Sequence, residues 1–479
     1  EDAYRVADTA ARLLKMVSAG EHALEVEAIG NELLRLRYNE AAKKSKRRAE
    51  TGPLQESTTP AGLKAWRQVI SPHPDVASGR YLQAEFAADM AQVLAGTAET
   101  EYQDPKEFFQ RTYLTEGLLN MLVTGIKRLT SQGGDPVVQL QTAFGGGKTH
   151  SMLALYHLSS GGVKLSDFAG GERIADLIGD VDLPEANRAV LVGTALDPAR
   201  PRVHPDATTH TLWGELAYQL GGKDGYELVA TADQKGVSPN SDTLKELLDS
   251  FGPCLIIIDE FVAYARNIYH VDDLPAGTFA SVMTFVQALT EATRRSADSM
   301  LLISLPESDI EVGGEAGQEA LEVLAHVVGR IESVWKPVTA NESFEIVRRR
   351  LVYTDKDYAA RDAVLKAFSD MYRNSSGEFP SGVAERPYYE RLSSAYPIHP
   401  EIFDRLYEDW STLGNFQRTR GVLQLLAQVV HRLWKDGNAD AMILPGALPL
   451  YDAAVRNKCL DYLPQGWDPV IDQDIDGEH

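Results

Sequence analysis

One stretch decides the fold of this chain: Leu140-Gln141-Thr142-Ala143-Phe144-Gly145-Gly146-Gly147-Lys148-Thr149-His150. It follows an apolar, strand-like run at 136–141 and opens a helical pattern at 148–158. Strand, glycine-rich loop and helix in this order are the context that a phosphate-binding loop requires. Glycines let successive backbone N–H groups point at phosphate oxygens, and the helix adds the positive end of its dipole. The stretch therefore predicts nucleotide binding by residues 142–150, the alternative being a plain glycine-rich turn.

Two side chains of this stretch have defined tasks in phosphate binding. Lys148 can reach the β- and γ-phosphates of a nucleotide, and the Thr149 hydroxyl can bind a magnesium ion. The usual glycine spacing is met at Gly145 and Gly147, but Thr142 stands where a glycine is expected. Because a β-branched residue does not readily take positive φ, we expect the loop to leave the strand there in extended geometry.

A second motif lies further along the chain, in the run Cys254-Leu255-Ile256-Ile257-Ile258-Asp259-Glu260. Such a continuous apolar run is typical of a buried parallel strand, and ligands meet open α/β sheets at the carboxyl ends of their strands. We predict that Asp259 holds the magnesium through water and that Glu260 is the general base for hydrolysis. The alternative is a core strand that ends in surface acids.

The two motifs together resemble those of AAA+ ATPases, which suggests further polar candidates. Ser304 ends the apolar run 299–304 and is the candidate sensor between the acidic motif and the γ-phosphate, although it could simply be a strand-end hydroxyl. Arg330 is the candidate finger that reaches a neighbouring subunit, which implies a homo-oligomer; a surface salt bridge is the alternative. Arg420, with Arg418 as the second choice, is the candidate lid sensor, because a guanidinium donates a planar fork to phosphate and keeps its charge.

Composition is that of an ordinary globular protein. The chain has 479 residues, 44% hydrophobic and 24% charged, with a net charge of −22. This charge disfavours a broad nucleic-acid-coating surface but leaves room for a local basic groove. The two cysteines cannot form a disulfide framework, and no apolar run has the length of a membrane span, so we expect a cytoplasmic protein without membrane contact. The chain begins at Glu1, and we expect it to be a fragment of a longer protein.

The pattern along the chain predicts an α/β fold, with a P-loop αβα core and a helical lid. The runs expected to form one parallel sheet are 136–141, 188–194, 254–260, 299–304 and 334–338. Residues 198–245, rich in Gly, Asp and Pro, are predicted as a long insertion that is partly loop. The expected divisions are a helical segment at 1–50, a helical lead-in at 51–130, the core at 131–340, the lid at 341–440, and the start of a C-terminal region at 441–479.

Several stretches also resemble one known family. They are Trp66, Pro72-His73-Pro74-Asp75-Val76, Glu85-Phe86-Ala87-Ala88-Asp89, Phe108-Phe109-Gln110-Arg111-Thr112-Tyr113-Leu114-Thr115, Phe144-Gly145-Gly146-Gly147-Lys148-Thr149-His150-Ser151, Thr211-Leu212-Trp213-Gly214-Glu215 and Tyr396-Pro397-Ile398-His399-Pro400-Glu401. Together they resemble the prokaryotic ATP-binding family catalogued as domain of unknown function four-nine-nine, over most of the chain. In that family the phosphate loop commonly lacks its first glycine, which accounts for Thr142.

The resemblance implies a setting as well as a fold. Members of the family often lie in anti-phage defence islands, beside DNA methyltransferase-like, helicase or nuclease genes, and are similar to the large ATPases of bacteriophage-exclusion systems. The expected function is an ATP- and Mg²⁺-dependent switch or motor in such a system, with DNA contacted through the complex. Two alternatives stay open: a nucleotide-gated scaffold with little turnover of its own, and a DNA translocase or helicase-like motor.

Overall fold

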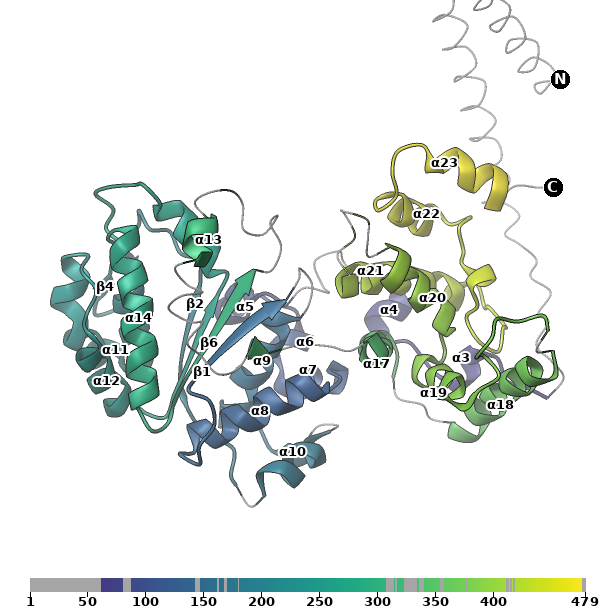
Figure 1. Ribbon diagram of the computed structural model, residues 1–479, viewed down its shortest axis with the longest axis horizontal. Coiled ribbons are helices and arrows are strands. Elements are labelled where there is room, and N and C mark those ends of the chain that lie inside the picture. The colour runs from purple at the N-terminus through teal and green to yellow at the C-terminus, as the bar shows by residue number, and fades with distance from the viewer. Residues whose placement is uncertain are drawn as a thin grey trace, which may run out of the picture.

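The computed structural model contains two bodies, one with a central sheet and one made of helices (Figure 1). The residues that it describes are 62–80, 88–142, 147–161, 163–167, 170–179, 181–306, 314, 317–322, 334–335, 340–353, 357–375, 377–410, 413, 416 and 418–475. The predicted helical segment at 1–50, Ala143 to Gly146 of the glycine-rich loop, and Arg330 lie outside these residues. Among the described helices, none has both the length and the apolar character needed to span a membrane.

The first body is built on a parallel sheet in the order β2-β5-β6-β1-β7. Its strands are β1 (Val137–Thr142), β2 (Asn187–Val192), β5 (Cys254–Asp259), β6 (Ser299–Pro306) and β7 (Val334–Trp335). These strands lie where the apolar runs predicted them. Because β6 pairs with both β1 and β5, the carboxyl ends of the glycine-loop strand and the acidic strand lie on either side of it. We call this body, with its flanking helices between residues 88 and 335, the α/β body.

Helices cover both faces of the sheet, as expected for strands that are apolar throughout. Every residue of β5 is buried; Ile256 and Ile258 pack into one core, Leu255 and Ile257 into the other. The first core is formed with α11 (Leu212–Gln234), α12 (Ser241–Ser250), α13 (Phe261–Ile268) and α14 (Phe279–Arg295). The second is formed with α5 (Met90–Ala95), α6 (Thr100–Gln103), α7 (Pro105–Arg111), α8 (Glu116–Leu129), α9 (Lys148–Leu158) and α10 (Gly171–Ile178).

Residues 198–245 contain more regular structure than the sequence predicted. A small antiparallel hairpin, β3 (Arg202–Val203) with β4 (Thr208–Thr209), is followed by α11 and α12. Helix α11 has non-helical backbone at Gly221 and Gly222, which divides it into a largely buried first piece and a second piece that is buried on one side only. Glycine lowers helix propensity, so its presence in this stretch concealed a helix that is held by burial of its apolar face against the sheet.

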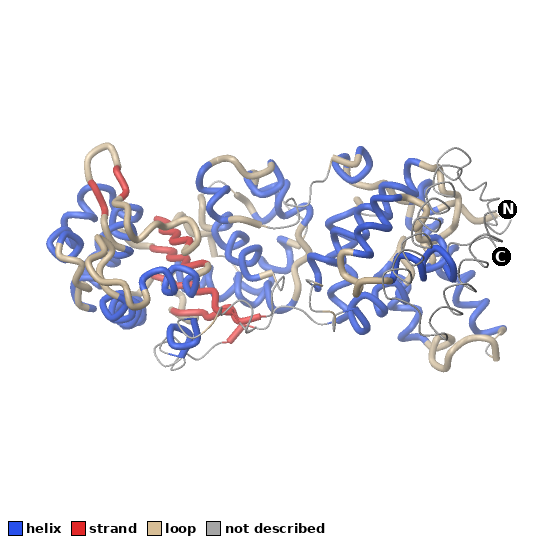
Figure 2. Tube along the Cα trace, turned by 90° about the horizontal axis from the view of Figure 1, so that it is seen from above, coloured by secondary structure: helices blue, strands red, loops and turns tan. Residues whose placement is uncertain are grey.

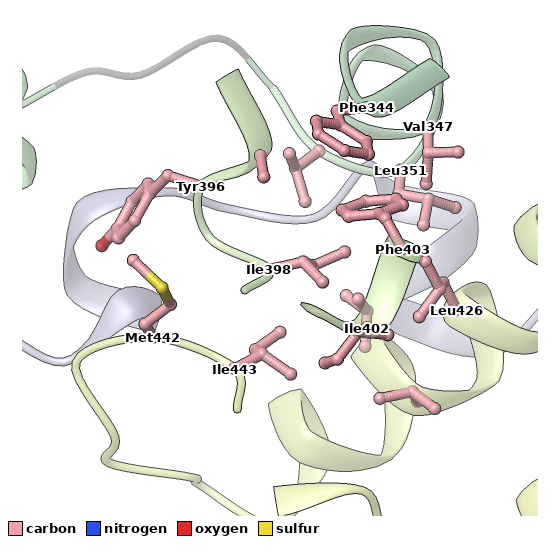
Figure 3. Packing of buried hydrophobic residues seen from close by; sticks show 14 of the residues in the cluster. Phe344, Val347, Leu351, Tyr396, Ile398, Ile402, Phe403, Leu426, Met442 and Ile443 are labelled. Carbon is pink, nitrogen blue, oxygen red and sulfur yellow. The ribbon is translucent and has the colours of Figure 1, made fainter. Parts of the chain in front are cut away.

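The described elements that pack in the second body are helices, and Figure 2 shows no red strand on the right, where this body lies. Its main helices are α17 (Ala340–Leu351), α18 (Tyr358–Asn374), α19 (Arg386–Ala395), α20 (Pro400–Asp404), α21 (Arg418–Lys435), α22 (Ala453–Leu460) and α23 (Trp467–Val470). Phe344, Phe403 and Leu426 converge from three of these helices in its core (Figure 3). We call this unit the helical body.

Two parts of the chain join the helical body from outside the predicted lid at 341–440. Helices α3 (Trp66–Val69) and α4 (Pro74–Ser78), within the predicted lead-in, pack there rather than on the sheet (Figure 1). Trp66 is fully buried, and its indole Nε1 donates to Asn438 Oδ1 at 2.9 Å. At the other end, Ile443 and Cys459 belong to the same core. The chain therefore enters the helical body, leaves to form the α/β body, and returns.

Candidate functional site

The glycine-rich stretch ends in a helix whose first turn points at the carboxyl edge of the sheet. Thr142 is the last residue of β1 and pairs with Pro306, so Thr142 itself has extended geometry. Gly147 then takes φ 83° and caps α9, which begins at Lys148. A left-handed conformation at this position favours glycine, since a side chain would be strained there. The backbone of this turn thus requires the glycine that the motif supplies.

Three predicted residues from three elements meet at this edge. Thr149 on α9 donates its hydroxyl to Asp259 Oδ2 at 2.9 Å, and Ser304, near the end of β6, donates to Asp259 Oδ1 at 2.6 Å. The two strands are neighbours, which places Asp259 and Ser304 side by side. The phosphate-loop helix, the acidic strand and the sensor strand are therefore joined through one carboxylate.

The carboxylate of Asp259 is almost completely removed from water, with 3% exposure. Burial raises its pKa, although hydrogen bonds from Ser304, Thr149 and the backbone N–H of Glu260, together with the charge of Lys148, act in the opposite direction. A buried carboxylate with a raised pKa is poised to receive a cation, because a cation would remove the cost of its ionisation.

The donor set at this point fits magnesium better than a softer metal. It consists of the Thr149 hydroxyl and the Asp259 carboxylate, both hard oxygen ligands, which meet at 2.9 Å. Among the described residues, no three His, Cys, Asp or Glu side chains converge to form an all-protein metal cage. Magnesium often binds through one or two protein oxygens, with waters and substrate phosphates completing its shell. The site therefore suits a magnesium ion that arrives with a nucleotide.

Glu260 lies directly beyond this carboxylate in an unusual backbone conformation. Its φ is 53°, in the left-handed region, and it caps the start of α13. Its backbone N–H donates to Asp259 Oδ1 at 3.0 Å and to Ser304 Oγ at 3.1 Å. Non-glycine residues rarely adopt this conformation, and strain of this kind gathers at functional sites. The residue itself is exposed at the strand end, where water can reach its carboxylate.

Gly193 belongs to the site, although the sequence analysis did not select it. It follows β2, and its N–H donates to Asp259 O at 2.8 Å. A Cβ placed on Gly193 would lie 2.1 Å from the carbonyl oxygen of Glu260. Only glycine leaves room for the left-handed turn that Glu260 makes. A glycine near the end of the predicted strand run 188–194 was the available signal.

His150, predicted within the phosphate loop, contacts the interior of the α/β body. Its Nε2 lies 3.0 Å from Thr112 Oγ1, and its ring centroid lies 4.5 Å from that of Phe108. Burial, with the nearby charge of Arg350 and then His157, lowers its pKa to about 3. The imidazole is therefore neutral at physiological pH and links α9 to the end of α7.

The predicted lid arginines, Arg418 and Arg420, lie on a different body from the phosphate-binding residues. Arg418 and Arg420 begin α21, which belongs to the helical body, whereas Lys148 and Asp259 belong to the α/β body. The guanidinium Nε of Arg420 is buried and finds no hydrogen-bond partner among the described residues. Leaving such a donor without a partner is costly, so an acceptor is expected at this position.

Comparisons with known proteins give the family of the chain. A search of curated proteins returns no match. The structure titled "Structure of C. elegans PCH-2" is similar at 13% sequence identity and a TM-score of 0.27, over 72% of this chain and 67% of that chain, a likeness too slight to support an argument. The model described as DUF499 N-terminal domain matches residues 68–345, and that described as DUF499 second domain matches residues 339–474. Since these two matches span most of the sequence, the chain belongs to the DUF499 family.

Proposed function

We propose that this protein is an AAA+-type P-loop ATPase that binds and hydrolyses ATP with Mg²⁺. The observation that carries the proposal is the hydrogen-bonded set Thr149–Asp259–Ser304 at the carboxyl edge of a parallel sheet. A helix capped by Gly147 in left-handed geometry supplies the first member, and the ends of two adjacent strands supply the others. Each of these features has a task in phosphoryl transfer.

In this proposal the residues divide the work of hydrolysis between them. The N-terminus of α9 and the Lys148 ammonium bind the β- and γ-phosphates, while Thr149 and Asp259 hold the metal. The magnesium ion, when bound, would neutralise charge that develops on the phosphate oxygens. Glu260 accepts a proton from water as the water oxygen attacks the γ-phosphorus; the bond to the β-phosphate oxygen breaks, and ADP and phosphate leave. Ser304 fixes the position of the Asp259 carboxylate relative to the turn at Glu260, because its hydroxyl donates to the carboxylate and accepts from the Glu260 N–H.

The helical body acts in this proposal as the lid. The buried Nε of Arg420 supports a role for this residue in contacting an anion, with Arg418 as the alternative. Arg330 would reach the nucleotide of a neighbouring copy, which makes the active form a homo-oligomer. The biological role proposed is a nucleotide-driven switch or motor in an anti-phage defence system, with DNA methyltransferase-like, helicase or nuclease proteins as partners.

The experiment that tests the proposal compares ATP binding and ATP turnover in four purified proteins, with and without double-stranded DNA. They are the wild type, Lys148→Ala, Glu260→Gln, and Glu246→Gln, an exposed glutamate on α12 that serves as the matched control. We expect Lys148→Ala to lose binding. Glu260→Gln should keep binding and lose turnover by roughly 10²–10⁴-fold, the usual contribution of a general base. Glu246→Gln should behave as the wild type.

Each other outcome has a definite meaning. If Lys148→Ala binds ATP as tightly as the wild type does, the phosphate-loop assignment is wrong. Tight binding without turnover in both the wild type and Glu260→Gln, with or without DNA, would favour the nucleotide-gated scaffold. Strong stimulation of turnover by DNA would instead favour a translocase, despite the net charge of −22, which weighs against a protein that tracks along DNA by itself.

A further inference from the structure

A compact network of charged side chains joins the two bodies. Arg111 on α7 donates from Nη1 to Asp75 Oδ2 at 2.9 Å and from Nη2 to Asp75 Oδ1 at 3.2 Å, and it also donates to Glu101. Arg350 on α17 donates to Glu101 Oε1 at 2.6 Å and to the Tyr102 hydroxyl at 2.7 Å. Asp75 and Arg350 belong to the helical body, whereas Arg111, Glu101 and Tyr102 belong to the α/β body. The Arg111–Asp75 and Arg350–Glu101 pairs therefore cross between the bodies, and the Arg111–Glu101 pair connects these two within the α/β body.

This junction is largely closed to water. The side chains of Arg350, Glu101 and Arg111 are 6%, 10% and 12% exposed, and that of Asp75 is 29% exposed. Two positive and two negative charges balance within it. Burial alone would raise the pKa of Asp75, but the hydrogen bond and charge of Arg111 hold it below its usual value. Removing one partner from such a network leaves an uncompensated charge, which is far costlier than the loss of a surface pair.

The same network continues to the phosphate-binding helix. Thr112 is next to Arg111 in the chain, its hydroxyl contacts His150 Nε2 at 3.0 Å, and it donates to the Phe108 carbonyl at 2.7 Å. His150 follows Thr149 directly, in the first turn of α9. If the first turn of α9 moves, the hydrogen bond between His150 and Thr112 therefore transmits the movement to the end of α7, whose last residue is Arg111.

We propose that the path His150–Thr112–Arg111, continued by Glu101, Asp75 and Arg350, couples nucleotide binding at α9 to the position of the helical body. The inference rests on the proposed function, because it takes ATP as the ligand that moves α9. Each arginine has more than one acceptor in reach, so the junction can exchange partners between two arrangements. The network residues are positioning residues, since their described link to the phosphate-binding helix runs through the contact of Thr112 with His150.

The test measures the distance between the two bodies directly. Spin labels are placed on Val237→Cys in the α/β body and Met371→Cys in the helical body, two sites whose native side chains are 57% and 41% exposed. The native thiols of Cys254 and Cys459 are buried, and burial raises the pKa of each to about 12, so they compete little for the label. Distance distributions are recorded with and without Mg²⁺ and a non-hydrolysable ATP analogue, and binding of the analogue is measured on the same samples.

Matched substitutions separate the junction from general damage. Asp75→Asn removes one charge of the network and keeps its shape. Asp436→Asn makes the same change in a carboxylate of similar exposure, 28%, whose partner Arg432 lies in the same helical body. Arg350→Lys is the second test variant, since it keeps the charge and loses the forked geometry. We expect the nucleotide-induced distance change to be present in the wild type and in Asp436→Asn, and largely lost in Asp75→Asn and Arg350→Lys, while affinity for the analogue changes less than about threefold.

Three results would overturn the coupling. The wild type could bind the analogue without any change in distance. Asp75→Asn and Arg350→Lys could both keep the full change, or Asp436→Asn could lose it equally. These results differ from a failure of the proposed function, in which the wild type binds no nucleotide and both proposals fall together. Turnover adds a second readout: a loss of coupling lowers kcat and leaves KM unchanged, whereas misfolding lowers the active fraction and the amount of analogue bound.

Discussion

Thr149 and Asp259 are separated by 110 positions in the chain, yet the hydroxyl of the first donates to the carboxylate of the second at 2.9 Å. The contact forms because β6 lies between the strands that carry the two motifs and brings their carboxyl ends to one edge. It gives the site a direct link between the phosphate-binding helix and the acidic strand.

Replacement of Asp259 by Asn should stabilise the protein in the absence of nucleotide and weaken its binding of Mg²⁺-ATP. The folded protein raises the pKa of Asp259 above the ordinary value of 3.8. A raised carboxyl pKa favours folding at low pH, and that contribution is lost as the pH rises through the folded pKa. At neutral pH the wild type therefore carries a buried charge that Asn removes. Thermal unfolding at pH 7.5 should show a higher midpoint for Asp259→Asn, and the advantage should shrink as the pH falls toward 3.8.

The same variant should bind Mg²⁺-ATP at least about tenfold more weakly, which corresponds to 1.4 kcal/mol. Asp362→Asn, at a carboxylate that is 55% exposed and paired with Arg361, is the control and should change neither property. A destabilised Asp259→Asn protein with unchanged nucleotide affinity would show that this carboxylate has a structural role instead.

Gly193→Ala should damage turnover more than binding. The added methyl group would lie 2.1 Å from the Glu260 carbonyl oxygen, so the left-handed turn at Glu260 must shift. Overpacking of this kind typically costs about 1–3 kcal/mol of stability. Because Glu260 is the proposed base and Lys148 is on another element, we expect kcat to fall with little change in ATP affinity.

The control for this prediction is Gly446→Ala, since no atom lies within 4 Å of a Cβ placed there. Its stability and kcat should match those of the wild type. If Gly193→Ala also retains wild-type turnover, the close contact with Glu260 has no part in catalysis.

Much of the sheet could be predicted from the sequence, because buried parallel strands are continuous apolar runs that need no partner to be recognised. The runs predicted at 254–260 and 299–304 correspond to β5 and β6, and the glycine-rich motif marked the start of α9. The meeting of Asp259 with Ser304 followed from adjacent strands. Which neighbour lies beside which strand, however, depends on the completed sheet rather than on any local pattern.

The parts that could not be predicted depend on contacts between distant segments. Trp66 is bonded to Asn438, 372 positions away, and nothing in either sequence neighbourhood indicates that pairing. The ring of His150 contacts Thr112, and nothing in the local sequence indicates that contact. Helix α11 was concealed because Gly221 and Gly222 interrupt its periodicity, and burial against the sheet outweighs their low propensity.

Stability should fall as the pH drops below 6.5, because several histidines are kept neutral by the fold. These are His73, His150, His157 and His399. Burial lowers the pKa to about 3 for His150 and about 4 for each of the others. The unfolded chain takes up these protons near pH 6.5 and the folded chain does not, so the stabilisation is full above 6.5 and declines toward pH 4. At pH 5 the loss is on the order of 1–2 kcal/mol for each histidine.

Denaturant unfolding between pH 7.5 and 5 checks this, with His157→Gln as the informative variant. Its ring contacts the Tyr102 carbonyl at 3.0 Å, a contact that an amide can also make. In His157→Gln, the number of protons taken up on unfolding at low pH should fall by about one, so the free energy of unfolding should depend less steeply on pH. His270→Asn is the control: this histidine is exposed with φ 54°, a conformation that Asn tolerates. An equal weakening in the control would mean that burial of His157 is not the cause.

Trp66→Ala should unfold the helical body at a lower temperature and leave the α/β body almost unchanged. The indole is fully buried, packs at 5.9 Å from the Trp434 ring, and donates to Asn438. Loss of a buried tryptophan typically costs about 3–5 kcal/mol, and here it also leaves the Asn438 amide oxygen without this donor. Calorimetry should therefore show two unfolding transitions, one for each body. The midpoint of the helical-body transition should fall, and the midpoint of the α/β-body transition, which Mg²⁺-ATP raises, should stay unchanged.

Two matched variants decide whether α3 is truly part of the helical body. Trp467→Ala removes an indole that is 43% exposed from the same body and should have little effect on either transition. Trp213→Ala removes a fully buried indole from the α/β core and should displace the other transition. If Trp66→Ala lowers the transition that responds to nucleotide, as Trp213→Ala does, then the chain N-terminal to the sheet stabilises the nucleotide-binding body. If Trp66→Ala lowers only the transition that does not respond to nucleotide, the helical body contains chain segments from before and after the sheet. Two chain connections then join the bodies, and a movement of the helical body must strain both of them at once.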